Sequence, residues 1–231
     1  MNVMSTSNVA IIIPVYNEGK VIASVVKNVL KQFDFVVCVN DGSKDNSESE
    51  IAKTKARLVN HPVNMGQGAA LQTGIEYALQ FPQIEYFVTF DADGQHSLAD
   101  AQKMLQYLQK NKVDVVLGSR FLGTAKNMSK LKKVILKLAV RFSNATSGIK
   151  LTDTHNGLRV FNRKFAEIIN ITQSDMSHAS EIIQRIAETK TPFKELPVTI
   201  TYTDYTVAKS HNPNLNAVNI VFDTLLRKLV K

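Results

Sequence analysis

Residues 87–96 read FVTFDADGQH, an apolar run that ends in two aspartates separated by one residue. Side chains alternate between the two faces of a strand, so Asp91 and Asp93 are expected to point the same way, about 7 Å apart. Gln95 would join them if the backbone stayed extended. Two carboxylates and an amide oxygen form a hard-oxygen site suited to Mg²⁺ or Mn²⁺ carrying phosphate oxygens. Two solvated aspartates in a turn would produce the same pattern, so the rest of the chain has to decide.

On both sides of this stretch, apolar runs of strand length alternate with segments of helical periodicity. The predicted strands are 9–14, 35–39, 57–59, 113–118 and 196–202, and the predicted helices are 21–29, 45–56, 68–79 and 98–110. This alternation predicts an α/β fold, with a parallel sheet covered by helices on both faces. Ligands of such sheets bind beyond the carboxyl ends of the strands, which is where residues 16–18, 41–43 and 91–95 fall.

A glycine turn at residues 64–68, NMGQG, leads into an Ala- and Leu-rich helix. Such a turn can offer backbone N–H groups to an anion at the helix N-terminus. Small residues there would equally allow close packing, and both interpretations stay open. The Rossmann G-x-G-x-x-G after the first strand and the Walker pattern are both absent from the sequence.

The composition is that of a globular protein of 231 residues, 44% of them hydrophobic. The single cysteine, Cys38, cannot form an internal disulfide, which fits a reducing cytosol. No signal peptide is recognisable, and no apolar stretch approaches the ~18 residues needed to span a bilayer. We expect one domain over residues 1–210, followed by a basic amphipathic segment over residues 211–231 that docks on the core, the membrane or another subunit.

The net charge of +8 is concentrated in one block. Residues 115–152 contain no acid but eight lysines and arginines, which predicts an anionic partner. Within this block, residues 128–142 are predicted to form a helix with an apolar face and a basic face. That pattern is typical of a helix in a membrane interface, although an ordinary surface helix is also amphipathic. Nucleic acid is disfavoured as the partner because no stacking aromatics alternate with the basic residues.

Further polar residues follow the basic block. Arg120 comes after the predicted strand 113–118 and could bind a phosphate, or be a plain surface arginine. The segment 151–161, LTDTHNGLRVF, brings Asp153, His155 and Arg159 close together. His155 suits a structural hydrogen-bonding role at least as well as a catalytic one. Glu181 opens another predicted helix.

Together these motifs resemble glycosyltransferase family 2, which has the GT-A fold. The resemblance rests on IPVYNE at 13–18, VNDGS at 39–43, NMGQG at 64–68 and DAD at 91–93, in this order. Within the family, the chain looks most like the dolichol- and polyprenol-phosphate sugar transferases. The motifs for this are DADGQH at 91–96, GSRF at 118–121, the basic helix before residues 152–153, and GLR at 157–159. The resemblance implies a Rossmann-like, mostly parallel sheet flanked by helices, with an amphipathic interface helix.

The resemblance also implies roles for single residues. Those expected to bind the nucleotide-sugar are Pro14, Tyr16, Glu18, Val39, Asp41, Asp91, Ala92, Arg120 and Lys209. The expected ligands of Mg²⁺ or Mn²⁺ are Asp91, Asp93 and Gln95. The expected catalytic residues are Asp93, Glu181, Asp153 and Arg120. The chain departs from the subgroup at two points, because Thr203 stands where an arginine is usual and His155-Asn156 precedes the GLR element.

The function expected from the resemblance is inverting transfer of a sugar from a UDP- or GDP-sugar to a polyprenyl phosphate or other lipid-linked acceptor. The site would lie at the inner face of the membrane, on a peripheral cytoplasmic enzyme. A phosphate nucleophile is already anionic and needs no strong base, whereas a sugar hydroxyl in cell-surface polysaccharide synthesis would need one, with Glu181 or Asp153 as candidates. A sugar nucleotidyltransferase is a further alternative, but residues 14–18 lack its Gly-rich loop. A homo-oligomer stays open.

Overall fold

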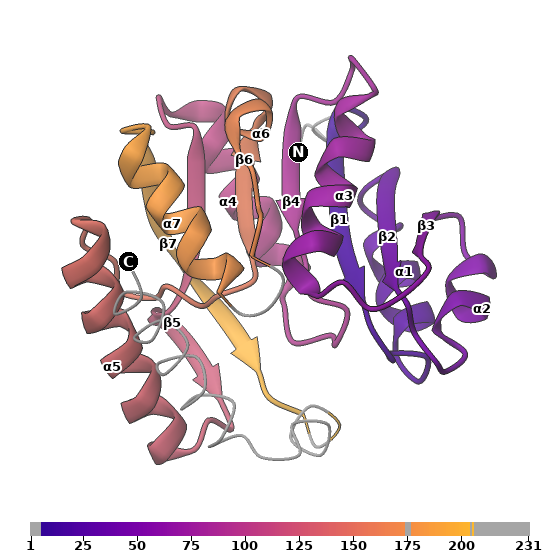
Figure 1. The fold of residues 1–231 in the computed structure, drawn as a ribbon, viewed down its shortest axis with the longest axis horizontal. Coiled ribbons are helices and arrows are strands. Elements are labelled where there is room, and N and C mark those ends of the chain that lie inside the picture. Colours follow the sequence, from indigo (N-terminus) through magenta and orange to yellow (C-terminus); the bar gives the residue numbers. More distant parts are fainter. Residues whose placement is uncertain (1–5, 174–176, 204, 206–231) are drawn as a thin grey trace.

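A sheet of seven strands, in the order β3-β2-β1-β4-β6-β5-β7, forms the centre of the described part of the molecule (Figure 1). The computed structural model describes residues 6–173, 177–203 and 205. The strands are β1 Val9–Val15, β2 Phe35–Asp41, β3 Arg57–His61, β4 Tyr86–Thr89, β5 Val115–Lys126, β6 Arg159–Asn162 and β7 Phe193–Thr201. Lys209 and the predicted C-terminal segment 211–231 lie outside the described residues, as does the proposed end of the domain at residue 210.

Helices cover both faces of the sheet, as an α/β chain requires (Figure 1). The helices are α1 Ile22–Val29, α2 Ser47–Ala52, α3 Gln67–Leu79, α4 Leu98–Lys110, α5 Lys130–Ser147, α6 Arg163–Ile168 and α7 His178–Glu188. Apolar residues of α1, α2 and α4 pack on one face of the sheet, and those of α3, α6 and α7 pack on the other. Ser97 caps α4 because its hydroxyl accepts a hydrogen bond from the Asp100 N–H.

The first four strands bring their carboxyl ends to one edge of the sheet. β1 pairs in parallel with β2 on one side and with β4 on the other, with Val15 opposite Asn40 and Ile12 opposite Thr89. Parallel strands in register leave the sheet at the same side, so the turns after β1, β2 and β4 are neighbours. This is the edge at which open α/β sheets bind ligands.

The expected mostly parallel sheet is confirmed, with β6 as an antiparallel exception. β6 pairs antiparallel with both β4 and β5, and Arg159 lies opposite Thr89 and Leu117. Because β6 runs the other way, its amino end lies at the edge where β4 and the parallel neighbours end. The loop that precedes β6 is thereby delivered to the same place as the two aspartates.

Two elements differ from the sequence prediction. The strand predicted for 113–118 continues as β5 to Lys126, because β7 runs parallel beside it along most of this length, with an irregularity between Ser119 and Thr124. β4 ends at Thr89, and residues 91–95 form a turn in which Gly94 has a φ of 75°. The prediction that Asp91 and Asp93 share the face of a strand is therefore wrong, since a turn brings them together.

Helix α5 presents two apolar faces rather than one. Leu136, Ala139 and Val140 are buried, whereas three other apolar residues are more than half exposed, namely Leu131, Val134 and Leu138. In Figure 1 the helix lies at the outer side of the molecule, next to α7. No helix among the described residues combines the length and the apolar character needed to cross a membrane.

Candidate active site at the carboxyl edge of the sheet

The turn after β1 is held by side chains that follow β2. Backbone N–H groups of residues 17, 18 and 19 donate to Ser43 Oγ at 3.0 Å, Ser47 Oγ at 2.8 Å and Asp45 Oδ2 at 2.9 Å. Asn17 adopts a φ of 53°, a left-handed conformation that is uncommon for L-residues but in which asparagine is enriched. These bonds place Glu18 in a buried position, where its Oε2 accepts a hydrogen bond of 2.7 Å from the Tyr205 hydroxyl.

A pocket of about 640 Å³ opens between the ends of β2 and β3. Tyr16, Gly42, His61 and Val63 are among the residues that line it, with polar groups from residues 40, 43, 44, 48, 60 and 64. Tyr16 and Val63 are exposed, so the pocket has apolar surface at its mouth. Apolar surface combined with a few fixed polar groups is typical of a small-molecule site.

The expected nucleotide residue Asp41 is almost fully buried, and its chain neighbours Asn40 and Gly42 line this pocket whereas Asp41 does not. Its carboxylate accepts hydrogen bonds of 2.8 Å from the Met65 and Gly66 N–H groups. Gly66 has φ 93° and ψ 158°, a conformation suited to glycine, just before α3 begins. The glycine turn of the sequence thus binds an anion of the protein itself, the side chain of Asp41.

Three of the expected nucleotide residues are part of the core. The side chain of Val39 is fully buried against α3, and Pro14 and Ala92 are buried as well. Only the backbone of Val39 could therefore touch a bound nucleotide. Among the residues expected to bind the nucleotide-sugar, it is Tyr16 whose side chain lines the pocket.

Asp91 and Asp93 lie in the turn after β4, each with its own partners. Asp91 Oδ2 is 2.8 Å from His96 Nε2, and Oδ1 accepts a hydrogen bond of 3.3 Å from Gln67. Asp93 accepts hydrogen bonds from the backbone and side-chain amides of Gln95, at 3.0 and 2.6 Å. The Gln95 amide thus donates to Asp93, while its carbonyl oxygen stays available as an acceptor.

The two aspartates have pKa values shifted in opposite directions. Burial acts to raise the pKa of Asp91, but the charge and hydrogen bond of His96, with Arg159 and His178, lower it below the ordinary value. Burial raises the pKa of Asp93 to about 6, and the negative charge of Asp91 adds to this shift. The turn therefore concentrates negative charge that a cation would relieve.

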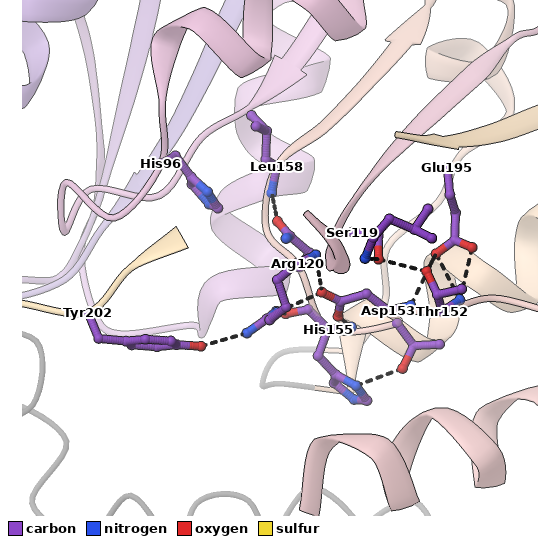
Figure 2. A network of polar contacts seen from close by, with 12 residues as sticks. His96, Ser119, Arg120, Thr152, Asp153, His155, Leu158, Glu195 and Tyr202 are labelled. Atoms are coloured by element: carbon purple, nitrogen blue, oxygen red, sulfur yellow. Dashed lines mark hydrogen bonds and ion pairs between the residues drawn. The ribbon is translucent and has the colours of Figure 1, made fainter. Parts of the chain in front are cut away.

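Arg120 is buried in a polar network instead of lying on the surface (Figure 2). Its Nε donates to Asp153 Oδ2 at 2.6 Å, Nη1 to the Tyr202 hydroxyl at 2.9 Å and Nη2 to the His155 carbonyl at 2.7 Å. Its backbone N–H also donates to Asp153 Oδ2, at 3.0 Å. All three guanidinium nitrogens of Arg120, on β5, thus hold protein oxygens, two from the loop before β6 and one from Tyr202, which follows β7.

Glu195, on β7, also fixes the beginning of this loop (Figure 2). It accepts hydrogen bonds from Thr152 N–H at 2.9 Å, from the Thr152 hydroxyl at 2.9 Å and from Asp153 N–H at 3.1 Å. Sequence reasoning did not identify Glu195, His96 or Tyr202 as part of the site. The DGQH motif contains His96 and could have identified it, but nothing local to Glu195 distinguishes it from other acidic residues on strands.

Positive groups gather where this loop meets the aspartate turn. Burial lowers the pKa of Arg159 to about 10, although Asp91 and Asp153 oppose this shift. Burial also lowers the pKa of Lys132 on α5, and Arg120 adds to the effect while Asp93 opposes it. His155 Nε2 and Arg159 Nη1 are buried without a hydrogen-bond partner in the described part of the chain. The unpaired N–H groups of Arg159 Nη1 favour an added anion.

Glu181 lies in the first turn of α7 and is engaged by the preceding loop. Its carboxylate accepts hydrogen bonds from Thr172 N–H at 3.0 Å, from the Thr172 hydroxyl at 2.6 Å and from Gln173 N–H at 2.9 Å. Both carboxylates considered as a base, Glu181 and Asp153, therefore have structural partners.

No group of three or more His, Cys, Asp or Glu side chains that could hold a metal ion occurs among the described residues. Magnesium and manganese sites for nucleotides do not need one, because one or two carboxylates suffice when phosphates and waters complete the shell. Burial raises the pKa of Asp93 and the negative charge of Asp91 adds to this shift, so a bound cation would stabilise the ionised pair. The turn 91–95 therefore fits a divalent ion that is shared with a bound diphosphate.

Comparison with known proteins identifies the family. Residues 10–169 match Glycosyl transferase family 2. A UDP-N-acetylglucosamine–dolichyl-phosphate N-acetylglucosaminyltransferase of Methanococcus voltae is 30% identical, over 99% of each chain. The polyprenol monophosphomannose synthase of Mycolicibacterium smegmatis is 26% identical, over 92% of this chain and 84% of that protein. The chain belongs to glycosyl transferase family 2 and is a glycosyltransferase, which argues against the nucleotidyltransferase alternative.

A solved structure supports the GT-A fold. Glucosyl-3-phosphoglycerate synthase from Mycobacterium tuberculosis, crystallised with Mn²⁺, UDP and phosphoglyceric acid, superposes with a TM-score of 0.69. The sequence identity is 12%, and the alignment covers 94% of this chain and 78% of that chain. At this identity the likeness establishes the fold and leaves substrate and residue roles to be argued from the site.

Proposed function

We propose that the protein transfers a sugar, with inversion, from a nucleotide-diphosphate sugar to a polyprenyl phosphate at the surface of a membrane. The relatives named above act on dolichyl phosphate or polyprenol, which supports this acceptor class. The uridine nucleotide in the name of the first relative favours UDP over GDP as the carrier.

The observation that carries the proposal is that both candidate bases, Glu181 and Asp153, are engaged by groups of the protein. Glu181 holds residues 172 and 173, and Asp153 is paired with Arg120 at 2.6 Å. A sugar hydroxyl needs a carboxylate to remove its proton, whereas a phosphate monoester already carries its negative charge. The surrounding positive groups, Lys132 and Arg159 among them, suit an anionic nucleophile.

The chain's own residues would prepare the leaving group. Asp91 and Asp93, with the Gln95 carbonyl oxygen, would hold Mg²⁺ or Mn²⁺, which would supply positive charge to the departing diphosphate. His96 orients Asp91 through its hydrogen bond of 2.8 Å. Lys209, outside the described residues, is proposed to contact the diphosphate as well, and Arg120 is proposed to act by positioning the loop that precedes β6.

We further propose that α5 brings the enzyme to the inner face of the membrane, as a peripheral protein. Leu131, Val134 and Leu138 are 51%, 55% and 53% exposed, in a stretch rich in lysine. Exposed apolar residues beside basic ones are typical of helices that lie in a lipid interface and attract anionic headgroups. The same helix carries Lys132, so the membrane and the acceptor phosphate would be approached together.

The test is transfer of labelled sugar from a UDP-sugar to a short-chain polyprenyl phosphate by wild type and Glu181→Gln. A general base contributes about 10²–10⁴-fold, so near-normal turnover in Glu181→Gln is expected for a phosphate acceptor. Thr172→Val is the matched control, because it removes the hydroxyl partner of Glu181 without changing the carboxylate. A loss of about 100-fold or more in Glu181→Gln alone would show that Glu181 is a required base, and wild type that transfers no sugar to the polyprenyl phosphate would overturn the proposed acceptor.

A further inference from the structure

A buried tyrosine to which the proposed reaction assigns no role contacts two cations. Tyr202 directly follows β7 and is 5% exposed. Its hydroxyl accepts a hydrogen bond of 2.9 Å from Arg120 Nη1, as Figure 2 shows. The ammonium nitrogen of Lys132, in the first turn of α5, lies over the Tyr202 ring at 4.2 Å from its centroid. One side chain thus holds a buried cation with its hydroxyl and a second cation with its ring.

The backbone fixes the place of this ring. The Tyr202 N–H donates to the Lys126 carbonyl at 3.2 Å, and the Tyr202 carbonyl accepts from Asn127 Nδ2 at 3.2 Å. The preceding residue, Thr201, donates its N–H to the Gln95 carbonyl at 3.2 Å. The ring is therefore anchored both to the end of β5 and to the turn that carries the two aspartates.

Lys132 is the member of this group that is available to a ligand. The guanidinium nitrogens of Arg120 all hold protein oxygens, whereas the Lys132 ammonium makes no hydrogen bond or ion pair within the described part of the chain. Burial lowers the pKa of Lys132, Arg120 adds to this shift and Asp93 opposes it. The ammonium thus lies within electrostatic reach of both Arg120 and Asp93, where a phosphate beside the aspartate turn would meet it.

The ring restricts a side chain that is otherwise flexible. A lysine places its ammonium at the end of a flexible four-carbon stem, so a free ammonium samples many positions. The face of an aromatic ring attracts a cation and confines it to the region above the ring. Without this ring, the Lys132 ammonium would keep its charge but would spend less time at one position.

We propose that Tyr202 is a positioning residue for the acceptor, whose ring holds the Lys132 ammonium at the place where the acceptor phosphate binds. The hydroxyl fixes the ring against Arg120, so the ring and both cations form one unit. Tyr202 acts through Lys132 and not on the reacting atoms. This inference rests on the proposed transfer to a polyprenyl phosphate.

The experiment measures transfer of labelled sugar to a short-chain polyprenyl phosphate by wild type, Tyr202→Met and Tyr202→Phe. Tyr202→Met should raise KM for the acceptor about tenfold, because the ammonium loses its aromatic support, while KM for the nucleotide-sugar changes less than about twofold. Tyr202→Phe keeps the ring and should stay within about threefold of wild type. Tyr202→Leu, a second variant without a ring, keeps the test decisive if Tyr202→Met does not fold.

The matched control is Tyr107→Met, which removes a partly buried tyrosine that packs on the core from α4. It should leave both KM values as in wild type. A KM for the acceptor that is unchanged in Tyr202→Met, or a loss in Tyr202→Phe as large as that in Tyr202→Met, would overturn this inference alone.

A double-mutant cycle separates positioning from general damage. Lys132→Met should lower kcat/KM for the acceptor about 100-fold, and adding Tyr202→Met should lower it little further, because the ring acts only through the ammonium. Independent effects would instead multiply to about 1000-fold and would overturn the inference. Wild type that transfers no sugar to the polyprenyl phosphate would overturn the proposed function and the inference with it.

Discussion

Asp91 and Asp93 are separated by a single residue, yet their surroundings shift their pKa values in opposite directions. His96, Arg159 and His178 stabilise the charged form of Asp91 and outweigh its burial. Asp93 has no such positive partner of comparable strength, so burial and the charge of Asp91 raise its pKa to about 6. Asp91 is thus held ionised and oriented by its partners. Asp93 is the side chain whose pKa an added cation would change most.

The substitution Asp93→Asn should have opposite effects without and with metal. In EDTA at neutral pH the variant should unfold at a temperature a few degrees higher than wild type, since about 1 kcal/mol of repulsion and desolvation is removed. With Mn²⁺ and UDP, wild type should gain stability and the variant should gain little. Thermal unfolding in both conditions measures this.

Asp34→Asn is the control for this experiment, because Asp34 is exposed and far along the chain from the turn. It should leave both melting temperatures unchanged. A lower melting temperature for Asp93→Asn in EDTA, or an undiminished response to Mn²⁺ and UDP, would contradict the assignment of Asp93 as a ligand.

His155 provides a pH dependence with a definite sign. Burial, together with the charges of Arg120, Arg159 and His178, lowers its pKa to about 4, although Asp153 opposes the shift. Between about pH 6.5 and 4 the unfolded chain therefore binds a proton that the folded protein excludes, and the stability falls as the pH falls. Above pH 7 both states are neutral at this position and the effect is absent.

The substitution His155→Asn should remove this dependence. Relative to the variant, wild type should lose about 1–2 kcal/mol between pH 7.5 and pH 4.5, measured by denaturant unfolding at intermediate pH values. Other titrating groups are common to both proteins, so their contributions cancel in the difference. A difference that does not vary with pH would show that His155 is accessible to protons in the folded state.

The loop of residues 152–157 is the element that joins the two sides of the site. Arg120 and Glu195 hold its beginning, and Gly157 lies against Asp91, where a Cβ atom would come within 2.3 Å of Oδ2. The Thr89 hydroxyl, at the end of β4, donates to the Gly157 carbonyl. A shift in this loop would therefore move the aspartate turn, and this is how we propose that Arg120 acts while its guanidinium is engaged by protein oxygens.

Helix α5 is the element whose exposed face is proposed to meet lipid. Replacing Leu131, Val134 and Leu138 together by serine should abolish flotation with anionic liposomes at low salt, because the apolar area available for insertion is lost. Each of these side chains is more than half exposed, so the melting temperature should change little. The measurement is flotation in parallel with thermal unfolding.

The matched control for α5 is Ile168→Ser, which removes a 41% exposed apolar side chain from another helix, α6. It should float as wild type does. Retained flotation of the triple variant, or wild type that does not float at low salt, would contradict the assignment of α5 to the membrane.

Across the whole molecule, the sheet order separates the two proposed substrates. β3, β2 and β1 carry the pocket and lie on one side of β4, whereas β6, β5 and β7 carry the polar network and α5 packs on that side. The aspartate turn follows β4, at the border between the two halves. An enzyme that joins two substrates gains by this arrangement, since each half can bind one of them next to the same turn.

Hydrogen exchange should report this division. UDP with Mn²⁺ is expected to slow exchange at residues 15–19, 41–44 and 61–67, whereas a short-chain polyprenyl phosphate should slow it at residues 118–122 and 152–159. Both ligands should slow exchange at residues 91–96, because the two are proposed to meet there. The same protection pattern from either ligand, or protection on the opposite halves, would contradict the proposed division.

The order of elements and the location of the site could be predicted from local sequence patterns. Apolar runs of strand length, alternating with helical periodicity, indicate a mostly parallel sheet, and turn residues at strand ends such as Asp41 and Asp91 indicate its binding edge. These signals are local because the spacing of buried residues within one segment already distinguishes a strand from a helix. The sequence motifs were also sufficient to identify the family.

The state of each side chain was decided only by the tertiary structure, because its partners are distant in the chain. Arg120 meets Asp153 and Tyr202 from positions 33 and 82 residues away, so an arginine expected to bind a phosphate, or else to lie on the surface, is a buried anchor. Glu195 and Tyr202 escaped detection for the same reason. By itself, the amino-acid sequence determined which polar groups gather at the edge of the sheet, through periodicity and strand ends. Only the folded chain decided which of them are engaged by the protein and which remain for a ligand, because hydrogen bonds and burial depend on neighbours that no local pattern specifies.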